Sequence, residues 1–391
     1  MPSRRVIVLG STGSVGTQTL ATIEHLNELH GRGESSLEFE VVGLACARRS
    51  RALLEQVARF GPGHVAIASA ADEAMPGTRV LAGDDAAERL VREVECDLVV
   101  SAIVGTAGLA ATHGAVSLGR NVALANKETL VAAGDLVVSA ARRSGAKLLP
   151  LDSEHAAAWQ CMGSGAPPFE ESPSIRRLIL TASGGPFRTM SLAACHDAPP
   201  EAALDHPTWS MGPKNTIDSA SLMNKGLELI EAHHLFALAS SKLDAVIHPQ
   251  SFVHAMVELE DSSLMAQMAC PDMRLPIQQA LTHPARLGSP VERADVCSLG
   301  SLTFEAVDPA RWPAIGLARR AIDEGCGAVL NGANEAAVAG YLAGRVRFGE
   351  IVGLVEAAMD RVGAPTIGSV EDALAVGEEA RGFVEGRVGS R

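Results

Sequence analysis

Residues 5–16 read RVIVLGSTGSVG, an apolar run that passes directly into three glycines, Gly10, Gly13 and Gly16. A helix-like segment follows to about residue 29, and a second apolar run, FEVVGLAC, occupies residues 39–46. Glycines at a strand-to-helix junction permit a tight turn and let backbone N–H groups approach a pyrophosphate. Because strand, glycine motif, helix and second strand occur in the required order, the stretch predicts dinucleotide binding rather than a plain structural turn.

Four more apolar runs continue this pattern to residue 152. They are HVAIAS (64–69), CDLVVSAI (96–103), NVALAN (121–126) and KLLPLD (147–152). Each is nearly continuous in Val, Ile, Leu and Ala, which is typical of a strand covered on both faces. We therefore predict an α/β fold whose residues 1–150 form a Rossmann-like, doubly wound parallel sheet.

The composition is that of a globular protein with two or three domains. Of its 391 residues, 47% are hydrophobic and 20% are charged. The net charge of −13 argues against a sequence-independent nucleic-acid binder. No run approaches the roughly 18 apolar residues of a membrane span, and no signal peptide is recognisable. Seven cysteines without a CxxC pair indicate reduced thiols, so we expect a cytoplasmic protein.

The pattern of predicted secondary structure changes after residue 150. Residues 151–285 predict an α+β catalytic domain with strands at 176–185 and 243–251 and a hairpin at 252–270 that turns at 260–263. Its segment 183–216 is rich in Gly, Pro, Ser and His, which is typical of a functional or mobile loop. Residues 286–312 have the composition of a linker, and residues 313–391 predict an α-helical bundle of four stretches.

Two polar groups follow strands of the predicted parallel sheet. Ala47-Arg48-Arg49 follows the second strand, where a carboxylate would favour NAD, and the arginines favour the 2′-phosphate of NADP instead. Arg51 is more typical of a solvated helix start. Asn126-Lys127-Glu128 follows the fifth run and would lie over the ligand crevice, although a helix cap and a first-turn acid explain it equally well.

Asp152 and Glu154 follow the last run of the sheet. In an extended segment, residues two apart project to the same side, so both carboxylates could meet one ion. Glu228 could add a third oxygen, because Asn224, Glu228 and Glu231 share a helix face. All-oxygen ligands favour Mg²⁺ or Mn²⁺, while a capped and solvated helix explains the same spacing.

The residue types of a phosphate cradle are spread over two segments. Ser183-Gly184-Gly185 follows a predicted strand, and Ser219, Asn224 and Lys225 lie near a helix start. Hydroxyl, amide, ammonium and backbone N–H groups together suit a phosphate. Simple turn chemistry is the alternative for each segment.

Together these blocks resemble the 1-deoxy-D-xylulose 5-phosphate reductoisomerase family over nearly the whole chain. The matching motifs, in order, are GSTGSVG, ALANKETLV, LPLDSEHAA, LTASGGPFR, HPTWSMGPKNTIDSASLMNKGLELIEA, HPQSFVHAMVE, CPDMRLPIQQAL and NGANEAAVA. The resemblance implies a homodimer of the non-mevalonate isoprenoid pathway that uses NADPH and Mg²⁺ or Mn²⁺. Its reaction rearranges and reduces the sugar phosphate 1-deoxy-D-xylulose 5-phosphate to 2-C-methyl-D-erythritol 4-phosphate.

The resemblance also implies roles for individual positions. Asp152, Glu154 and Glu228 match metal ligands with catalytic roles. The positions that match substrate contacts are Lys127, Ser153, Glu154, Ser183, His206, Trp209, Ser219, Asn224, Lys225 and Glu228. Of these, Lys127 and His206 are also expected to be catalytic, and Trp209 and Met211 match a flap that closes over the substrate. The positions that match the nucleotide site are Gly10, Thr12, Gly13, Ser14, Val15, Asn126, Glu128 and Gly212.

Two positions depart from the family pattern. Ala47-Arg48-Arg49 stands where Gly-Lys-Asn is common, which keeps the basic character but adds a Cβ at Ala47. Cys270 stands where a small polar residue is expected. The residues alone leave two rivals, a different NADP-dependent dehydrogenase that needs no metal and a non-catalytic NADP-binding protein.

Overall fold

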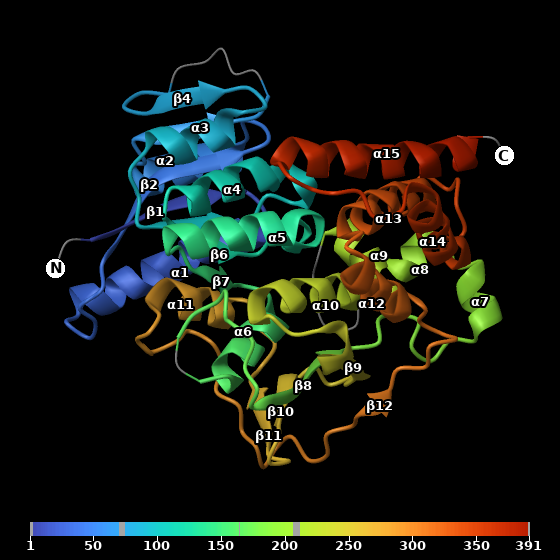
Figure 1. Cartoon of the computed structure of the whole chain (residues 1–391). Coiled ribbons are helices and arrows are strands. Elements are labelled where there is room, and N and C mark those ends of the chain that lie inside the picture. Colours follow the sequence, from blue (N-terminus) through green and yellow to red (C-terminus); the bar gives the residue numbers. More distant parts are fainter. Residues whose placement is uncertain (1–2, 70–74, 164, 206–211, 390–391) are drawn as a thin grey trace.

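The computed structural model describes residues 3–69, 75–163, 165–205 and 212–389. A seven-stranded sheet, a five-stranded sheet and a group of C-terminal helices make up the chain (Figure 1). The helix α10 lies between these three parts in Figure 1. This central position matters below, because α10 carries residues of the candidate site.

The N-terminal sheet is parallel throughout, with the order β4-β3-β2-β1-β5-β6-β7. Its strands are β1 (Arg4–Leu9), β2 (Phe39–Cys46), β3 (His64–Ile67), β4 (Arg79–Ala82), β5 (Leu98–Ser101), β6 (Asn121–Leu124) and β7 (Leu148–Pro150). The order reverses between β1 and β5, and ligands of such sheets bind at that switch point, beyond the carboxyl ends of the strands. The doubly wound prediction is confirmed. The sequence did not reveal the edge strand β4, in which only Leu81 is buried.

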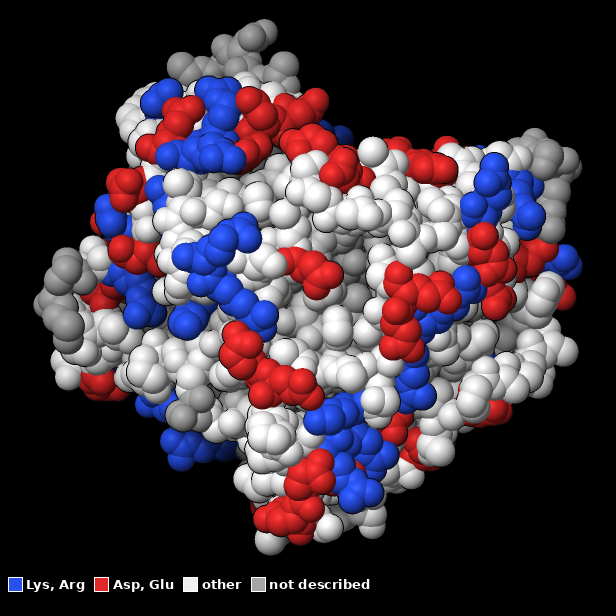
Figure 2. All heavy atoms as spheres, in the orientation of Figure 1, with Lys and Arg blue, Asp and Glu red and all other residues white. Residues whose placement is uncertain are grey.

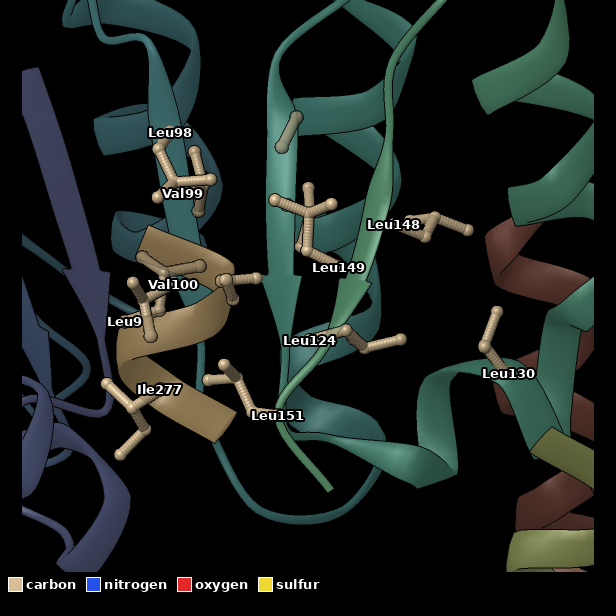
Figure 3. Packing of buried hydrophobic residues seen from close by; sticks show 14 of the residues in the cluster. Leu9, Leu98, Val99, Val100, Leu124, Leu130, Leu148, Leu149, Leu151 and Ile277 are labelled. Atoms are coloured by element: carbon tan, nitrogen blue, oxygen red, sulfur yellow. The ribbon is translucent and has the colours of Figure 1, made fainter. Parts of the chain in front are cut away.

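Helices cover both faces of this sheet. On one face, α3, α4 and α5 pack side by side, and α11 packs on the other face together with α1. Figure 3 shows Ile277 of α11 close to Leu9, Val100 and Leu151 of the sheet region. The helices are α1 (Ser14–Gly31), α2 (Arg51–Phe60), α3 (Ala86–Glu93), the 3-10 turn η1 (Gly105–Gly108), α4 (Leu109–Ser117), α5 (Lys127–Ser144) and α11 (Arg274–Thr282).

The second sheet has the order β11-β10-β8-β9-β12, with β8 and β9 parallel and the other pairs antiparallel. Its strands are β8 (Ile175–Ala182), β9 (Leu243–Ile247), β10 (Val253–Leu259), β11 (Leu264–Met268) and β12 (Glu305–Ala306). The helices α6 (Ser153–Cys161) and α10 (Met223–Phe236) pack against it, and η2 (Ser240–Lys242) precedes β9. The β10–β11 hairpin turns where the sequence predicts it. The strand β12 lies inside the expected linker and was not predicted.

The expected loop at 183–216 contains short helices. They are α7 (Leu192–His196), α8 (Pro200–Ala203) and the start of α9 (Pro213–Ala220). Residues 206–211 lie outside the described residues, and with them His206, Trp209 and Met211. Gly212 precedes α9 directly and is its N-cap.

The predicted C-terminal helices are confirmed as α12 (Ala314–Glu324), α13 (Gly327–Leu342), α14 (Ile351–Val362) and α15 (Val370–Gly389), with η3 (Phe348–Glu350) before α14. They share one hydrophobic core with α9 and α10, to which Leu227, Ile230 and Val329 contribute. The helix α13 packs on α14 and α15 and also touches α5 and α9. The C-terminal helices are therefore attached to both other parts of the molecule.

Two surface properties bear on function. Among the described residues, no helix combines the length and the apolar character needed to cross a bilayer. On the face shown in Figure 2, basic and acidic side chains are interspersed, so this face offers no extended basic surface of the kind that nucleic-acid binding requires.

Candidate active site

The glycine motif lies where β1 meets α1, at the switch point of the parallel sheet. Gly10 has φ 76°, and a Cβ there would lie 2.4 Å from the carbonyl oxygen of Ala102. A Cβ on Gly16 would lie 2.2 Å from the Gly10 oxygen, so both glycines are required by packing. Gly13 is exposed and caps α1 without a side-chain hydrogen bond. The first turn of α1 thus presents backbone N–H groups to an anion, which fits a pyrophosphate.

Basic residues lie beside this turn, at the end of β2. Ala47 and Arg48 are exposed, Arg49 is half-buried, and Ser50 accepts a hydrogen bond from the N–H of Leu53 to cap α2. Because β2 is the neighbour of β1, the two arginines stand next to the glycine turn. Their guanidinium groups suit a 2′-phosphate.

Asn126 is the N-cap of α5 at the end of β6. Its Oδ1 accepts from the N–H of Thr129 at 3.1 Å, and its Nδ2 donates to the carbonyl oxygens of Ile103 and Gly105. The cap interpretation is therefore confirmed, and the same side chain also holds the loop after β5. Glu128 is buried in the first turn of α5 and pairs with Lys214 at 2.9 Å. Lys214 was not singled out from the sequence.

The structure brings together the carboxylates of Asp152, Glu154 and Glu228. Their ligand oxygens all lie within 4.8 Å of one another. Asp152 is the N-cap of α6 and Glu154 is in its first turn, whereas Glu228 comes from α10. The extended geometry expected for residues 152–154 is wrong, because the chain has already entered α6, and the turn at its N-cap brings the two acids together instead. Three carboxylates form a donor set that fits Mg²⁺ or Mn²⁺.

Two buried ammonium groups lie among these acids. Lys127 Nζ lies 2.9 Å from Asp152 Oδ2 and 2.9 Å from Glu228 Oε1. Lys225 Nζ lies 2.9 Å from Glu154 Oε1 and also pairs with Glu228. Burial alone would lower the pKa of each lysine, but the surrounding carboxylates raise it. Both lysines therefore remain charged, and two positive charges face three acidic groups.

Burial and the carboxylates of Glu228 and Asp152 raise the pKa of Glu154 to about 7, despite the opposing effect of Lys225. Burial would likewise raise the pKa of Asp152, but Lys127 and His155 hold it well below its usual range. Neighbouring carboxylates thus differ strongly in proton affinity. Such a separation is typical of sites that perform acid–base chemistry.

A second layer behind the acids was only partly anticipated. His155 is fully buried, with Nδ1 3.1 Å from Asp152 Oδ1 and Nε2 2.8 Å from the carbonyl oxygen of Glu228. Glu231 Oε2 lies 3.7 Å from the same ring. Burial would lower the pKa of His155, but Glu231 and Asp152 raise it to about 9. The Asp-x-x-His spacing at the start of α6 is the one sequence signal that could have revealed His155.

The two segments of the predicted phosphate cradle are neighbours. Gly185 has φ 66°, and a Cβ there would lie 2.7 Å from the carbonyl oxygen of Ser219, so the SGG turn rests against α9. Ser183 accepts a hydrogen bond from the N–H of Gly185. Asn224 accepts from Lys127 at 2.8 Å and donates to Glu228. The amide of Asn224 and the ammonium groups of Lys127 and Lys225 therefore face the acids, while the SGG turn packs against Ser219.

Cys270 lines a small pocket at the edge of this cluster. The pocket also contains Ser153, His254 and Asp272. Nothing in the structure explains why a thiol stands at this position.

Comparison with known proteins gives one consistent family. Residues 6–134 match the family described as 1-deoxy-D-xylulose 5-phosphate reductoisomerase, and residues 148–236 and 268–383 match two C-terminal domains of the same reductoisomerase. The proteins called 1-deoxy-D-xylulose 5-phosphate reductoisomerase in Anaeromyxobacter dehalogenans and Sinorhizobium medicae are 46% and 45% identical to this chain. The first alignment covers 99% of this chain and 98% of the relative, and the second covers 98% of each.

Two solved structures have the same fold. The reductoisomerase of Zymomonas mobilis in complex with NADPH is 40% identical, with a TM-score of 0.87 and full coverage of both chains. A DOX-P reductoisomerase in complex with NADPH, fosmidomycin and magnesium is 35% identical, with a TM-score of 0.88 and 98% coverage of both chains.

The buried charges predict how the stability of the metal-free protein depends on pH. The native pKa values of Glu154 and Glu231 are raised from 4.5 to about 7, and that of His155 is raised from 6.5 to about 9. A raised native pKa stabilises the fold at low pH, and this contribution disappears as the pH passes through the native value. The melting temperature in EDTA should therefore fall between pH about 6 and pH about 9.

Added Mg²⁺ should raise the melting temperature more at the alkaline end, because a metal binds the deprotonated acids. The variant Glu154→Gln should show a shallower pH dependence in EDTA, and Glu356→Gln on the exposed side of α14 should match the wild type. Melting curves of wild type and Glu154→Gln with the same pH dependence would contradict this account.

Proposed function

The chain belongs to the 1-deoxy-D-xylulose 5-phosphate reductoisomerase family, and we propose that its paired acids and glycine turn perform that family's reaction. In this reaction, 1-deoxy-D-xylulose 5-phosphate is rearranged and then reduced by NADPH to 2-C-methyl-D-erythritol 4-phosphate, a step of the non-mevalonate isoprenoid pathway. The observation that carries the proposal is the convergence of Asp152, Glu154 and Glu228 at the same end of the parallel sheet as the glycine turn.

In this proposal, Asp152, Glu154 and Glu228 hold a divalent cation. When bound, Mg²⁺ or Mn²⁺ supplies a Lewis acid that polarises the substrate's carbonyl oxygen and makes its adjacent hydroxyl more acidic. The neighbouring hydroxyl of Ser153 donates to Glu154 and orients that carboxylate.

The proton carrier is proposed to be Glu154 or Lys127. A pKa of about 7 lets Glu154 accept or donate a proton near neutral pH, which favours it for this role. Lys127 is held strongly in its charged form by Asp152 and Glu228, which favours a role in binding negative charge.

The phosphate of the substrate is assigned to the neighbouring cradle residues Ser183, Ser219, Asn224 and Lys225. Binding the phosphate there would orient the carbon skeleton at a distance from the bonds that change. His206 and Trp209, outside the described residues, are expected to contact the substrate because of the family resemblance alone.

NADPH is assigned to the switch point of the parallel sheet. Residues Gly10 and Thr12–Val15 would hold the pyrophosphate, and Ala47, Arg48 and Arg49 the 2′-phosphate. Asn126, Glu128 and Gly212 would border the nicotinamide end. We propose residues 1–150 as the NADPH-binding domain, 151–285 as the catalytic domain, 286–312 as a linker and 313–391 as the C-terminal domain.

We also propose a homodimer formed at the free edge of the five-stranded sheet. The edge strand β11 exposes Leu264, Met265 and Met268. An exposed apolar edge strand invites pairing with another chain. A cytoplasmic location is proposed because all seven cysteines are free thiols.

The dimer proposal predicts one species in sedimentation velocity, with about twice the mass of the 40.6 kDa chain. Changing both Leu264 and Met268 to Lys should shift this species to the monomer, because the added charges repel across a two-fold axis. Leu54→Lys on α2, an exposed leucine away from the edge, should leave the mass unchanged. A monomeric wild type would exclude the dimer.

The variant Glu228→Gln tests the metal role. It keeps the side-chain volume but removes one ligand charge, so turnover of 1-deoxy-D-xylulose 5-phosphate with Mn²⁺ should fall by at least about 100-fold. NADPH oxidation measures the turnover, and NADPH fluorescence should show nearly unchanged nucleotide affinity. A loss of nucleotide affinity as large as the loss of turnover would count against the assignment. Wild-type turnover in EDTA would instead indicate a metal-independent dehydrogenase.

The double variant Arg48→Ser/Arg49→Ser tests coenzyme selection. Losing charge-assisted hydrogen bonds to the 2′-phosphate should raise the KM for NADPH by about 10- to 100-fold, with little effect on the KM for NADH. The matched control is Arg51→Ser, whose guanidinium pairs with Glu55 at 2.7 Å on the exposed face of α2. Equal effects on NADPH and NADH would mean that the 2′-phosphate is bound elsewhere.

A further inference from the structure

The motif NGANEAAVA in the C-terminal domain has no role in the site described above. Its Asn334 lies on α13 and is fully buried. Asn334 Nδ2 donates a hydrogen bond to Asp218 Oδ1 at 2.9 Å. Asp218 belongs to α9 and is also fully buried. The C-terminal domain therefore contacts the helix that leads into the acid-bearing α10.

The contact continues from Asp218 to the nucleotide side of the molecule. Lys214 Nζ lies 2.9 Å from Asp218 Oδ2 and 2.9 Å from Glu128 Oε1. The side chains of Lys214, Glu128 and Asp218 are 19%, 5% and 1% exposed. A continuous, mostly buried chain of polar groups thus runs from α13 through α9 to the first turn of α5.

Packing holds the two ends of this chain at a fixed separation. The helix α13 begins at Gly327, where a Cβ would lie 2.1 Å from the carbonyl oxygen of Val131 in α5. The helix α13 thus touches α5 directly at Gly327 and touches α9 through Asn334. Because both contacts are close, the packing of α13 on α5 and α9 fixes the distance that the polar chain spans between α9 and α5.

The charges of this chain depend on Lys214. Burial would raise the pKa of Glu128, but Lys214, together with a backbone N–H group and Lys127, lowers it. Burial would lower the pKa of Lys214, but Asp218 and Glu128 raise it. Without Lys214, the buried carboxylates of Glu128 and Asp218 would lack their shared counter-ion, and burying an unpaired charge destabilises the fold. Glu128 would then be protonated or displaced.

We propose that Lys214 is a positioning residue for NADPH. Through Lys214, Asp218 of the catalytic domain and Asn334 of the C-terminal domain hold the Glu128 carboxylate in place, so that it can accept a hydrogen bond from the nucleotide. The inference rests on the proposed function, because it assigns Glu128 to the nicotinamide end of NADPH. It gives the C-terminal motif a functional task, which is to fix a nucleotide-binding side chain in another domain.

The test is a double-mutant cycle between Lys214 and Glu128, with the NADPH dissociation constant measured by fluorescence in the absence of substrate. Lys214→Met should weaken NADPH binding by about 10-fold or more in the wild-type background. In the Glu128→Gln background, the same change should weaken it by no more than about twofold, since no carboxylate remains to be held. Lys214→Arg should recover most of the lost affinity, and Asn334→Ala should weaken binding in the same direction but less.

Steady-state kinetics separate positioning from a general loss of structure. Lys214→Met should raise the KM for NADPH while changing kcat and the KM for the phosphosugar far less. Lys242→Met, which removes a half-buried lysine paired with Glu171 at 3.6 Å near β9, is the matched control and should leave NADPH affinity unchanged.

Equal losses of NADPH affinity in the two backgrounds would overturn the proposal, as would an unchanged affinity in Lys214→Met. In either case, turnover by the wild type would leave the proposed function intact. A wild type that binds no NADPH would overturn both.

Discussion

The structure depends on compensation among charges buried between helices that are far apart in the sequence. Asp152, Glu154 and Glu228 come from two helices and meet two ammonium groups, Lys127 of α5 and Lys225 of α10. None of these groups could be buried alone, because burying an isolated ion in a protein interior costs roughly several kcal/mol of free energy even after relaxation. The cluster therefore fixes the positions of α5, α6 and α10 relative to one another.

This requirement explains the position of α10. The helix is buried along most of its length, with Lys225, Glu228 and Glu231 buried together with Leu227, Leu229 and Ile230. A helix that is both apolar and charged in its interior is stable only where partners approach it from several sides. The helix α5 supplies Lys127, and α6 supplies Glu154, His155 and its N-cap Asp152. The C-terminal helices cover the apolar side.

Much of the fold could be predicted from the sequence, because it follows from local patterns. Continuous apolar runs predicted six of the seven parallel strands, and helical spacing predicted all four C-terminal helices. The strands β4 and β12 were missed because each is short and lies at a sheet edge, where burial leaves little trace in the sequence. Asp152 and Glu154 were paired correctly but for the wrong local reason, since a helix N-cap and not an extended strand brings them together. The polar chain behind Glu128 could not be predicted. Its partner Lys214 and the more remote Asn334 lie 86 and 206 residues away in sequence, and only the packing of α9 and α13 brings them near.

The two clusters of charged groups, one around Glu228 and one around Lys214, differ in whether their protonation can change near neutral pH. Around Glu228, the acidic groups outnumber the lysines, and the pKa of Glu154 is raised to about 7, so its protonation can change near neutral pH. Around Lys214, the pKa of Glu128 is lowered and that of the lysine is raised, so no proton moves near neutral pH. A group whose charge is fixed is suited to hold another residue in place, whereas a group poised near neutrality is suited to react. The same residue types are thus divided between the two tasks by the balance of charge around them, although Lys127 and Glu128 of the two systems are consecutive in sequence.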